Sequence, residues 1–288
     1  MCRSRPHHYL KVKRLIIFLL LALTPVSAAP LSRPIVGEDL EYISRQGDTL
    51  LSIAFANGVA IEHLAFANGY PTSATGILPG TRLVVPKRKI LPANPPRDGL
   101  VLNVPERALY FFKNGKFQEF LPVSVGSAPE TKTPLGSFSI IEKVKDPTWY
   151  APDWAAEPGP HPPGPDNPLG DRWIGLSAPR VGIHGTNDPL NVGASVTHGC
   201  VRCYPEHVRA LFDKVVVGLP VRIEYETAKV GQDSEGNLFI ATFPDVYQRS
   251  NPVQRATKLL SKLGRGARLE DRNFSGKLDL TLGMPLKL

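Results

Sequence analysis

Hydrophobic and polar positions follow three different patterns along this chain, and each predicts a different kind of segment. From 41 to 87, apolar residues recur at helical spacing between two short strand-like runs. From 99 to 144 they form closely spaced short runs separated by turn residues, which is typical of β-strands. From 146 to 173 prolines interrupt any regular pattern. The chain is therefore expected to contain a small mixed unit, a β-rich domain and an irregular insertion.

The small unit is expected to have the order strand, helix, helix, strand. Asp48 or Thr49 can cap the first helix, because a short polar side chain accepts a hydrogen bond from a free backbone N–H group there. Asn57 and Gly58 then end that helix, since glycine adopts the left-handed conformation of a helix C-terminus without strain. The predicted elements are a strand from Tyr42, helices at 50–56 and 61–67, and a strand at 82–86.

The region from Gly99 onward is expected to be β-rich with a small helical part. Asn114 and Gly115 form a strong hairpin signal between two apolar runs. The predicted strands cover residues 100–104, 108–112, 117–125, 138–144 and 221–224. Further on, the pattern predicts a strand at 238–243 and a helix at 252–263. The predicted fold class is therefore mainly β with small helices.

The insertion at 146–173 contains eight prolines together with Trp149 and Tyr150. A long irregular segment inside a compact domain is usually functional or disordered. Aromatic side chains on a proline-stiffened loop suit a lid over an extended substrate, so Trp149 and Tyr150 are candidate substrate-binding residues. The alternative is a loop that only covers an apolar edge of the domain.

The first residues have the composition of an export signal. Five Lys or Arg residues and no acidic residue precede an apolar run at 15–26, which is too short to span a bilayer comfortably. Small residues at 27–29 suit cleavage. We predict a signal peptide at 1–29 and localisation in the periplasm or cell envelope. The alternative is an uncleaved membrane anchor.

Charge and cysteine content narrow the function classes. The formal net charge of +8 falls to about +3 once the five positive charges of residues 1–29 are removed. The chain has no basic stripe with interleaved aromatic residues, so we predict no nucleic-acid partner. Only Cys200 and Cys203 lie outside the predicted signal peptide, which excludes a disulfide-rich scaffold.

The residues best suited to chemistry lie between 181 and 207. Val181 and Ile183 predict a strand that ends at His184. Cys200 is expected on a turn just ahead of a helix that begins near Pro205, where the helix N-terminus would favour the thiolate. His184 could then accept the thiol proton.

Two other uses of these side chains stay open at this point. A zinc site could draw on five residues, namely His184, His198, Cys200, Cys203 and His207. The chain offers no second cysteine pair, however, and such a site would occupy the thiol, so we predict no metal and no cofactor. A disulfide between Cys200 and Cys203 could act as a redox switch, with Cys203 an inert second thiol as the plainer alternative.

The same window resembles the signature of the L,D-transpeptidases of bacterial cell-wall synthesis, whose catalytic domain is called YkuD. That signature is a His-Gly pair, a short loop, and then Ser/Thr-His-Gly-Cys-apolar-Arg/Asn. The matching residues here are His184, Gly185, Thr197, His198, Gly199, Cys200, Val201 and Arg202. The resemblance extends over residues 99–225 and includes the turn from Thr133 to Gly136. Members usually carry a non-cysteine residue at the position of Cys203.

The resemblance implies roles for these residues. Cys200 would attack a peptide carbonyl to form a thioester, and His184 would act as general base and then as acid. The Gly185 carbonyl would orient His184. Backbone N–H groups from His198 to Cys200, including that of Gly199, could form an oxyanion hole. The remaining candidates are Arg202, which would hold a substrate carboxylate or order the loop, and Gly185 and Thr197 as substrate-binding positions.

The small unit resembles the LysM module, which binds the N-acetylglucosamine sugars of peptidoglycan and chitin. The matching residues are Tyr42, Gly47, Asp48, Thr49, Leu50, Ile53, Ala54, Asn57, Gly58, Val59, Leu64, Asn68, Leu78, Pro79 and Gly80. Sugar contacts are expected from the turns after Gly47 and around Pro79. The proline-rich, charged segment at 88–98 reads as a semi-rigid linker. Deleting the module is then expected to weaken binding to insoluble peptidoglycan and to spare turnover of soluble fragments.

The resulting expectation is a β-rich L,D-transpeptidase catalytic domain at 99–225, a small βααβ LysM domain at 41–87, and an extension at 226–288 without an assigned role. It would transfer a tetrapeptide stem, with loss of D-alanine, to an amine of a second stem or of an envelope lipoprotein. The alternatives are a non-catalytic cell-wall-binding protein and a thiol oxidoreductase using Cys200 and Cys203. The absence of a βαβ pattern weighs against the last.

Overall fold

The computed structural model describes residues 33–74, 76–127, 129–150, 159–266, 274, 276, 278 and 282–288. The predicted signal peptide at 1–29 lies outside these residues. Within them, no single helix is long and apolar enough to cross a membrane. The helices α1 (Leu50–Asn57) and α2 (Ile61–Ala67) pass this test together by length and composition, but the pair is bent by 110°.

The first unit, here called the βααβ module, has the predicted order of elements. Its elements are β2 (Leu40–Ile43), α1 (Leu50–Asn57), α2 (Ile61–Ala67) and β3 (Arg82–Val85). Thr49 accepts a hydrogen bond from the backbone of Ser52, and the Ser52 hydroxyl accepts one from Thr49, so a capping box starts α1. Gly58 ends the helix at φ 65°, a conformation that glycine adopts without strain.

The second unit, the barrel domain, is built on a nine-stranded sheet with the order β13-β7-β14-β12-β11-β8-β15-β5-β6. The sheet closes on itself because β6 also pairs with β7. Its strands are β5 (Gly99–Asn103), β6 (Ala108–Lys113), β7 (Lys116–Gly126), β8 (Gly136–Lys145), β11 (Arg172–Leu176), β12 (Gly182–His184), β13 (Ser195–Thr197), β14 (Val201–Cys203) and β15 (Pro220–Glu224). The predicted class, mainly β with small helices, is confirmed.

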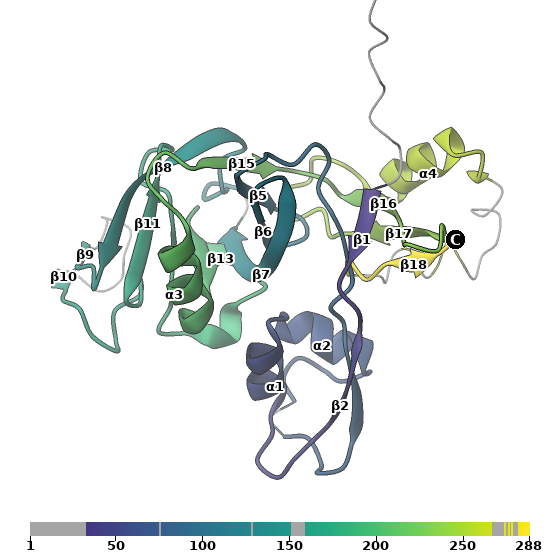
Figure 1. Ribbon diagram of the computed structural model, residues 1–288. Helices are drawn as coiled ribbons and strands as arrows, with labels where there is room; N and C mark the ends of the chain where they lie inside the picture. Colours follow the sequence, from purple (N-terminus) through teal and green to yellow (C-terminus); the bar gives the residue numbers. More distant parts are fainter. Residues whose placement is uncertain are drawn as a thin grey trace, which may run out of the picture.

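The barrel encloses the largest apolar core of the molecule. Inward side chains include Leu102, Val123, Ile183 and Val201. Helix α3 (Pro205–Lys214) contributes its apolar face, with Val208, Leu211 and Phe212, to the same core. The insertion at 146–173 leaves the barrel as a small hairpin of β9 (Trp149–Tyr150) and β10 (Pro160–His161), so it is not wholly irregular (Figure 1).

Residues 226–288 form a third unit, here called the C-terminal unit. It contains β16 (Ala228–Gln232), β17 (Leu238–Thr242), α4 (Pro252–Lys262) and β18 (Leu286–Lys287). Its five-stranded sheet, ordered β18-β17-β16-β1-β4, also takes in β1 (Arg33–Val36) and β4 (Lys89–Ile90), which flank the βααβ module in the sequence. Figure 1 shows this sheet beside the barrel, with the βααβ module below both.

The segment at 88–98 differs from the expected linker. Lys89 and Ile90 pair with β1, and Ile90 is buried between Ile35 and Phe243. The carbonyls of Ala93 and Asn94 accept hydrogen bonds from Arg222. Both ends of the βααβ module are thus held in one sheet. The sequence pattern could not reveal this, because β4 is two residues long and gains its stability from tertiary pairing.

The βααβ module is also docked on the barrel domain. Phe55 of α1 packs edge-on against Tyr204 with ring centroids 5.2 Å apart, and stacks on His207 at 6.0 Å. Glu62 of α2 pairs with Arg107 at 3.1 Å. Arg107 precedes Cys200 in the sequence, and Tyr204 and His207 follow it. The expectation that the module can be deleted without consequence for the barrel domain therefore loses its structural basis.

A buried charged pair links the C-terminal unit to the barrel. Lys229 Nζ lies 2.5 Å from Glu106 Oε2, and the two side chains are 0% and 1% exposed. Glu106 also accepts a hydrogen bond from the Tyr110 hydroxyl at 2.6 Å. Near the surface of the same junction, Arg33 of β1 forms a two-pronged pair with Glu226 at 2.5 and 2.7 Å. A pair buried this deeply requires that the two units fold together.

Candidate functional site

The register of β12 against β14 brings the candidate chemistry onto one face. The strands pair in parallel, with Ile183 opposite Val201 and His184 opposite Arg202. Since side chains alternate along a strand, Ile183 and Val201 point into the barrel core. His184, Arg202 and Cys200 consequently face outward together, on the convex side of the barrel.

Two glycines on this face make room for an indole ring. Trp173 of β11 is opposite His184, and its ring lies 6.0 Å from the imidazole at an interplanar angle of 26°. A Cβ atom on Gly182 would lie 2.5 Å from that ring, and one on Gly175 would lie 2.6 Å from Glu142. Glu142 accepts a hydrogen bond from the indole N–H at 2.8 Å. The ring can therefore cover His184 only because both neighbouring positions lack a side chain.

The His184 imidazole is held in one tautomer. Its Nδ1 lies 2.6 Å from the Gly185 carbonyl oxygen. A carbonyl only accepts, so Nδ1 carries the proton and Nε2 presents a lone pair. Burial lowers the pKa of His184 to about 4, assisted by the positive charge of Arg202 and opposed by the Gly185 hydrogen bond. At neutral pH the residue is thus an uncharged base.

The Cys200 thiol is partly exposed and points toward the chain that precedes β12. It donates a hydrogen bond to the Arg180 carbonyl at 3.6 Å. Burial raises the pKa of this thiol, while the Gly182 N–H group and Arg202 act in the opposite direction. The expected helix N-terminus does not lie next to it, because β14 separates Cys200 from α3. The influence of a helix dipole ends within its first turn, so α3 gives no thiolate stabilisation here.

Cys203 lies on the opposite side of β14. It is fully buried in the barrel core, and this burial raises the pKa of its thiol to about 12. Both cysteines are free. A disulfide would require one of two side chains on opposite faces of a strand to cross it, so the geometry disfavours both the redox switch and a Cys-x-x-Cys oxidoreductase. Within the described ranges, no group of three or more His, Cys, Asp or Glu side chains could hold a metal ion.

The turn before Cys200 is organised by Thr197. Its hydroxyl accepts a hydrogen bond from the Gly199 N–H group at 3.3 Å and donates one to the Cys200 carbonyl at 2.6 Å. Gly199 has φ +109°, which favours glycine, and a Cβ atom there would lie 3.5 Å from the Lys132 carbonyl oxygen. His198 is exposed on this turn. Thr197, a candidate substrate-binding residue, therefore shapes the turn that carries the thiol.

Arg202 is a cation whose charge acts on both candidate catalytic residues, His184 and Cys200. Burial lowers its pKa, and Asp188 and Cys200 act against that shift. Its Nε atom is buried without a hydrogen-bond partner among the described residues. A buried guanidinium with an unsatisfied donor is well suited to an incoming anionic group, because the cost of removing water from it has already been met.

The insertion at 146–173 is fastened beside His184. Asn167 is buried and donates to the carbonyls of Pro147, His161 and Pro162 at 2.8, 3.2 and 3.2 Å. A Cβ atom on Gly170 would lie 2.9 Å from the backbone of Thr186, so this end of the insertion packs on the residues that follow His184.

Trp149 and Tyr150 lie farther out on the same insertion, in β9. The Trp149 ring lies 5.1 Å from His161, whereas Tyr150 is exposed. Residues 151–158, which include the third aromatic residue of the insertion, lie outside the described part of the chain. The structure therefore places Trp149 and Tyr150 on the β9–β10 hairpin of the insertion.

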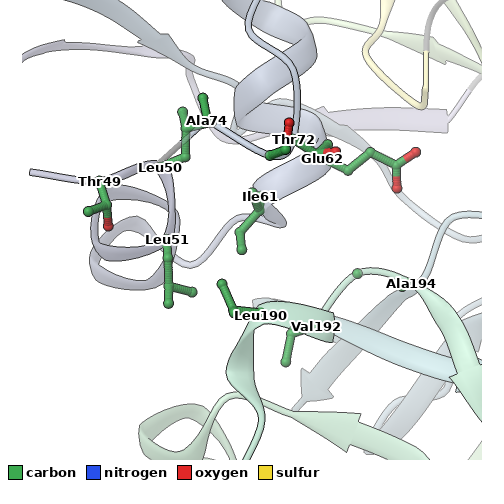
Figure 2. A pocket seen from close by; sticks show the side chains of 12 residues that line it. Thr49, Leu50, Leu51, Ile61, Glu62, Thr72, Ala74, Leu190, Val192 and Ala194 are labelled. Atoms are coloured by element: carbon green, nitrogen blue, oxygen red, sulfur yellow. The ribbon is translucent and has the colours of Figure 1, made fainter. Parts of the chain in front are cut away.

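A second candidate site lies between the βααβ module and the barrel domain. It is a cavity of about 680 Å³. Its lining residues are Thr49, Leu50, Leu51, Ile61, Glu62, Thr72, Ser73, Ala74, Leu190, Val192, Gly193 and Ala194. Figure 2 shows Leu51 and Ile61 facing Leu190 and Val192 across it. The barrel wall is η1 (Pro189–Asn191) and the residues after it, in the loop that joins His184 to Cys200.

The sequence patterns missed Trp173, Glu142 and the barrel wall of this cavity. Trp173 is the last residue of the segment that the sequence pattern predicts to be an irregular insertion. A usable signal was present, because Gly175 and Gly182 occupy strand positions where glycine weakens a sheet unless another group comes close. Leu190 and Val192 gave no signal, since only the docking of the βααβ module places them in a site.

Comparison with known proteins agrees with both parts of this architecture. The family model of the YkuD L,D-transpeptidase catalytic domain matches residues 97–223, and that of the LysM domain matches residues 42–86. The protein named "Probable L,D-transpeptidase ErfK/SrfK" from Salmonella typhimurium is 32% identical over 280 residues, covering 88% of this chain and 87% of the relative.

One further relative and one solved structure are also similar to this chain. The protein named "Probable L,D-transpeptidase YcfS" from Escherichia coli is 30% identical over 228 residues, covering 72% of this chain and 68% of its own. A crystal structure of the Enterococcus faecium L,D-transpeptidase superimposes with a TM-score of 0.37 at 22% identity, over 49% of this chain and 56% of that one. The chain belongs to the L,D-transpeptidase family and carries an N-terminal LysM module.

Proposed function

We propose that this protein is an L,D-transpeptidase of peptidoglycan that works through a Cys200 thioester. The observation that carries the proposal is the shared outward face of β12 and β14. It presents the Cys200 thiol, a neutral His184 with Nε2 unprotonated, and the Arg202 cation together. A thiol, a base and a cation in one place are the parts that acyl transfer requires.

In the first half-reaction, His184 Nε2 takes the proton of the Cys200 thiol as Sγ attacks a peptide carbonyl carbon. The new bond is C–S, and the bond that breaks is the C–N bond to D-alanine. His184 returns its proton to the departing amine of D-alanine. Because the pKa of Cys200 is raised and that of His184 lowered, the resting pair is uncharged, and proton transfer accompanies attack rather than preceding it.

In the second half-reaction, an amine attacks the thioester. A C–N bond forms, the C–S bond breaks, and the sulfur recovers a proton through His184. The acceptor amine belongs either to a second stem peptide or to a lysine of an envelope lipoprotein, and in both cases the protein acts in the periplasm or cell envelope. A cell-wall-binding protein without catalytic activity would not need an unprotonated His184 Nε2 on the same face as a thiol.

The oxyanion that forms during each attack needs donors close to Cys200. The Gly199 N–H group is already engaged by the Thr197 hydroxyl, so the Cys200 N–H group is the better candidate. Arg202, with its unsatisfied Nε, is suited to a carboxylate of the donor stem. The motif alone offered the backbone N–H groups from His198 to Cys200 for the oxyanion hole, and this assignment favours that of Cys200.

The proposal is tested by release of D-alanine from purified tetrapeptide muropeptides. We expect release of D-alanine that requires an acceptor amine or water and that stops after alkylation with iodoacetamide. A thioester intermediate on Cys200 should be visible by intact mass. A fully alkylatable Cys200 together with no release from any tetrapeptide fragment would overturn the proposal. Muropeptide profiles of cells with and without the protein then separate the two acceptors.

We further propose that the cavity between the two domains receives the glycan strand. Its walls carry apolar side chains for sugar faces and the hydroxyls of Thr49, Thr72 and Ser73 for sugar edges. Glu62, the charged residue of the lining, is neutralised by Arg107. The cavity therefore favours an uncharged, amphipathic ligand such as an N-acetylated amino sugar.

Leu190 tests this placement, because it is the barrel-domain residue that faces the LysM side chains and is 63% exposed. Leu190→Arg should weaken binding of a chitin pentasaccharide at least about tenfold, measured by calorimetry, since the longer charged side chain would replace an apolar wall of the cavity and fill part of its space. The matched control is Val217→Arg, at a residue of the same domain that is 59% exposed and lies outside the cavity lining. Equal affinity of both variants would place the glycan elsewhere.

A further inference from the structure

The C-terminal unit sends one tyrosine into the core of the barrel domain. Tyr247 lies between β17 and α4, is 3% exposed, and packs with the apolar residues of the barrel. Its ring stacks on Tyr225 with centroids 5.5 Å apart. The match to the catalytic family ends at residue 223, so Tyr247 comes from a part of the chain without an assigned role.

The Tyr247 hydroxyl closes the loop between β7 and β8. It accepts a hydrogen bond from the Thr133 N–H group at 2.9 Å and donates one to the Gly126 carbonyl at 2.9 Å. The Thr133 hydroxyl in turn accepts from the Gly126 N–H group at 2.8 Å. A single buried hydroxyl therefore joins both ends of this loop.

The same loop lies against the turn that carries the nucleophile. The Ser127 N–H group donates to the Thr197 carbonyl at 3.0 Å. At the other end, the Lys132 carbonyl oxygen lies 3.5 Å from the position of a Cβ atom on Gly199. Thr197 holds Gly199 and Cys200 through its own hydroxyl. Hydrogen bonds and direct packing thus run without a break from Tyr247 to Cys200.

We propose that Tyr247 is a positioning residue for the Cys200 turn, so that the C-terminal unit supports catalysis through the loop between β7 and β8. It touches neither substrate nor thiol. Its hydroxyl keeps the loop pressed on Thr197 and Gly199, and this keeps the turn closed around the thiol. The effect on transfer rests on the function proposed above, whereas the effect on thiol reactivity does not.

The test compares Tyr247→Phe with Tyr225→Phe in the full chain. Each variant keeps its ring and loses two hydrogen bonds, because the Tyr225 hydroxyl donates to Asp245 at 2.6 Å and accepts from the Tyr247 N–H group at 2.7 Å. None of the hydrogen bonds of the Tyr225 side chain given for the described residues reaches the loop between β7 and β8. Tyr225→Phe removes a hydrogen bond to the Tyr247 backbone but keeps the Tyr247 hydroxyl and both of its hydrogen bonds, so the pair tests that hydroxyl itself.

For Tyr247→Phe we expect kcat to fall about tenfold with KM within twofold, as expected when a group acts on the reacting turn and not on substrate affinity. The pH midpoint for alkylation of Cys200 by iodoacetamide should move downward, because a looser turn lets water reach the thiol. Cys203 serves as an internal control and should stay unmodified. Tyr225→Phe should leave kcat and the alkylation midpoint unchanged.

Identical alkylation profiles for wild type and both variants would overturn the proposal, as would equal losses of kcat in both variants. Alkylation of Cys203 in Tyr247→Phe would also overturn it, since that result means unfolding of the barrel core. If the wild-type protein released no D-alanine, the proposed function would fail, yet the alkylation comparison would still decide the role of Tyr247.

Discussion

Replacing Cys200 with serine is expected to reduce D-alanine release and transfer at least about a thousandfold while leaving the fold intact. The reason is the weakness of the base. Burial holds the pKa of His184 at about 4, and such a base cannot deprotonate a hydroxyl whose pKa lies far above that of a thiol. His184→Ala should be nearly as damaging. Activity of Cys200→Ser within tenfold of wild type would remove Cys200 from its role.

The control for that experiment is a variant of the second cysteine, Cys203, and its burial in the barrel core decides which variant is suitable. An inert second thiol, the plainer alternative from the sequence, would tolerate replacement by serine. In the structure a hydroxyl at this position would be buried in apolar surroundings, which costs about 1–3 kcal/mol when it has no partner. Cys203→Val, which keeps an apolar side chain of similar volume, is the better control and should retain transfer within about threefold.

The second large effect is expected at the junction of the barrel and the C-terminal unit. Lys229→Met should lower the free energy of unfolding by about 3–5 kcal/mol, because it leaves the Glu106 carboxylate buried without its cation. Thermal and urea unfolding of the full chain measure the loss. Since Lys229 does not face the Cys200 turn, we expect the folded fraction to keep its thiol reactivity.

Two variants make this stability prediction specific. Lys258→Met removes an exposed lysine from α4 of the same unit and should change stability by less than about 0.5 kcal/mol. Adding Glu106→Gln to Lys229→Met should recover part of the loss, because the unpaired carboxylate is then removed, although buried Lys89 loses its attraction to Glu106 as well. A Lys229→Met protein as stable as Lys258→Met would mean that water reaches Glu106 and that the pair does not hold the units together.

Local sequence signals predicted the local elements well. Helix α2 was expected at 61–67 and has those bounds, and α1 begins at the predicted Thr49 cap. Asn251, just before Pro252, caps α4 by accepting a hydrogen bond from the Gln254 N–H group. These features depend on side chains within a few residues of each other, so the information lies in the sequence itself.

Other features depended on residues far apart in the chain, and the local patterns did not contain them. Strand β1 pairs with β16, and β4 pairs with β1, so the supposed linker became part of a sheet. The helix expected to activate Cys200 begins after an intervening strand, and burial therefore raises the pKa of the thiol instead of a dipole lowering it.

By itself, the sequence determined the family and the order of elements in the βααβ module, and it singled out Cys200 and His184 as candidates, because motifs and periodicity are local. Only the tertiary structure decided what surrounds them. The register of β12 and β14 put the thiol, imidazole and guanidinium on one face and turned Cys203 into the core. Docking of the LysM module created the cavity at Leu190, and the C-terminal unit placed Tyr247 behind the nucleophile. Such contacts join residues with no periodic relation in the chain, so packing alone specifies them.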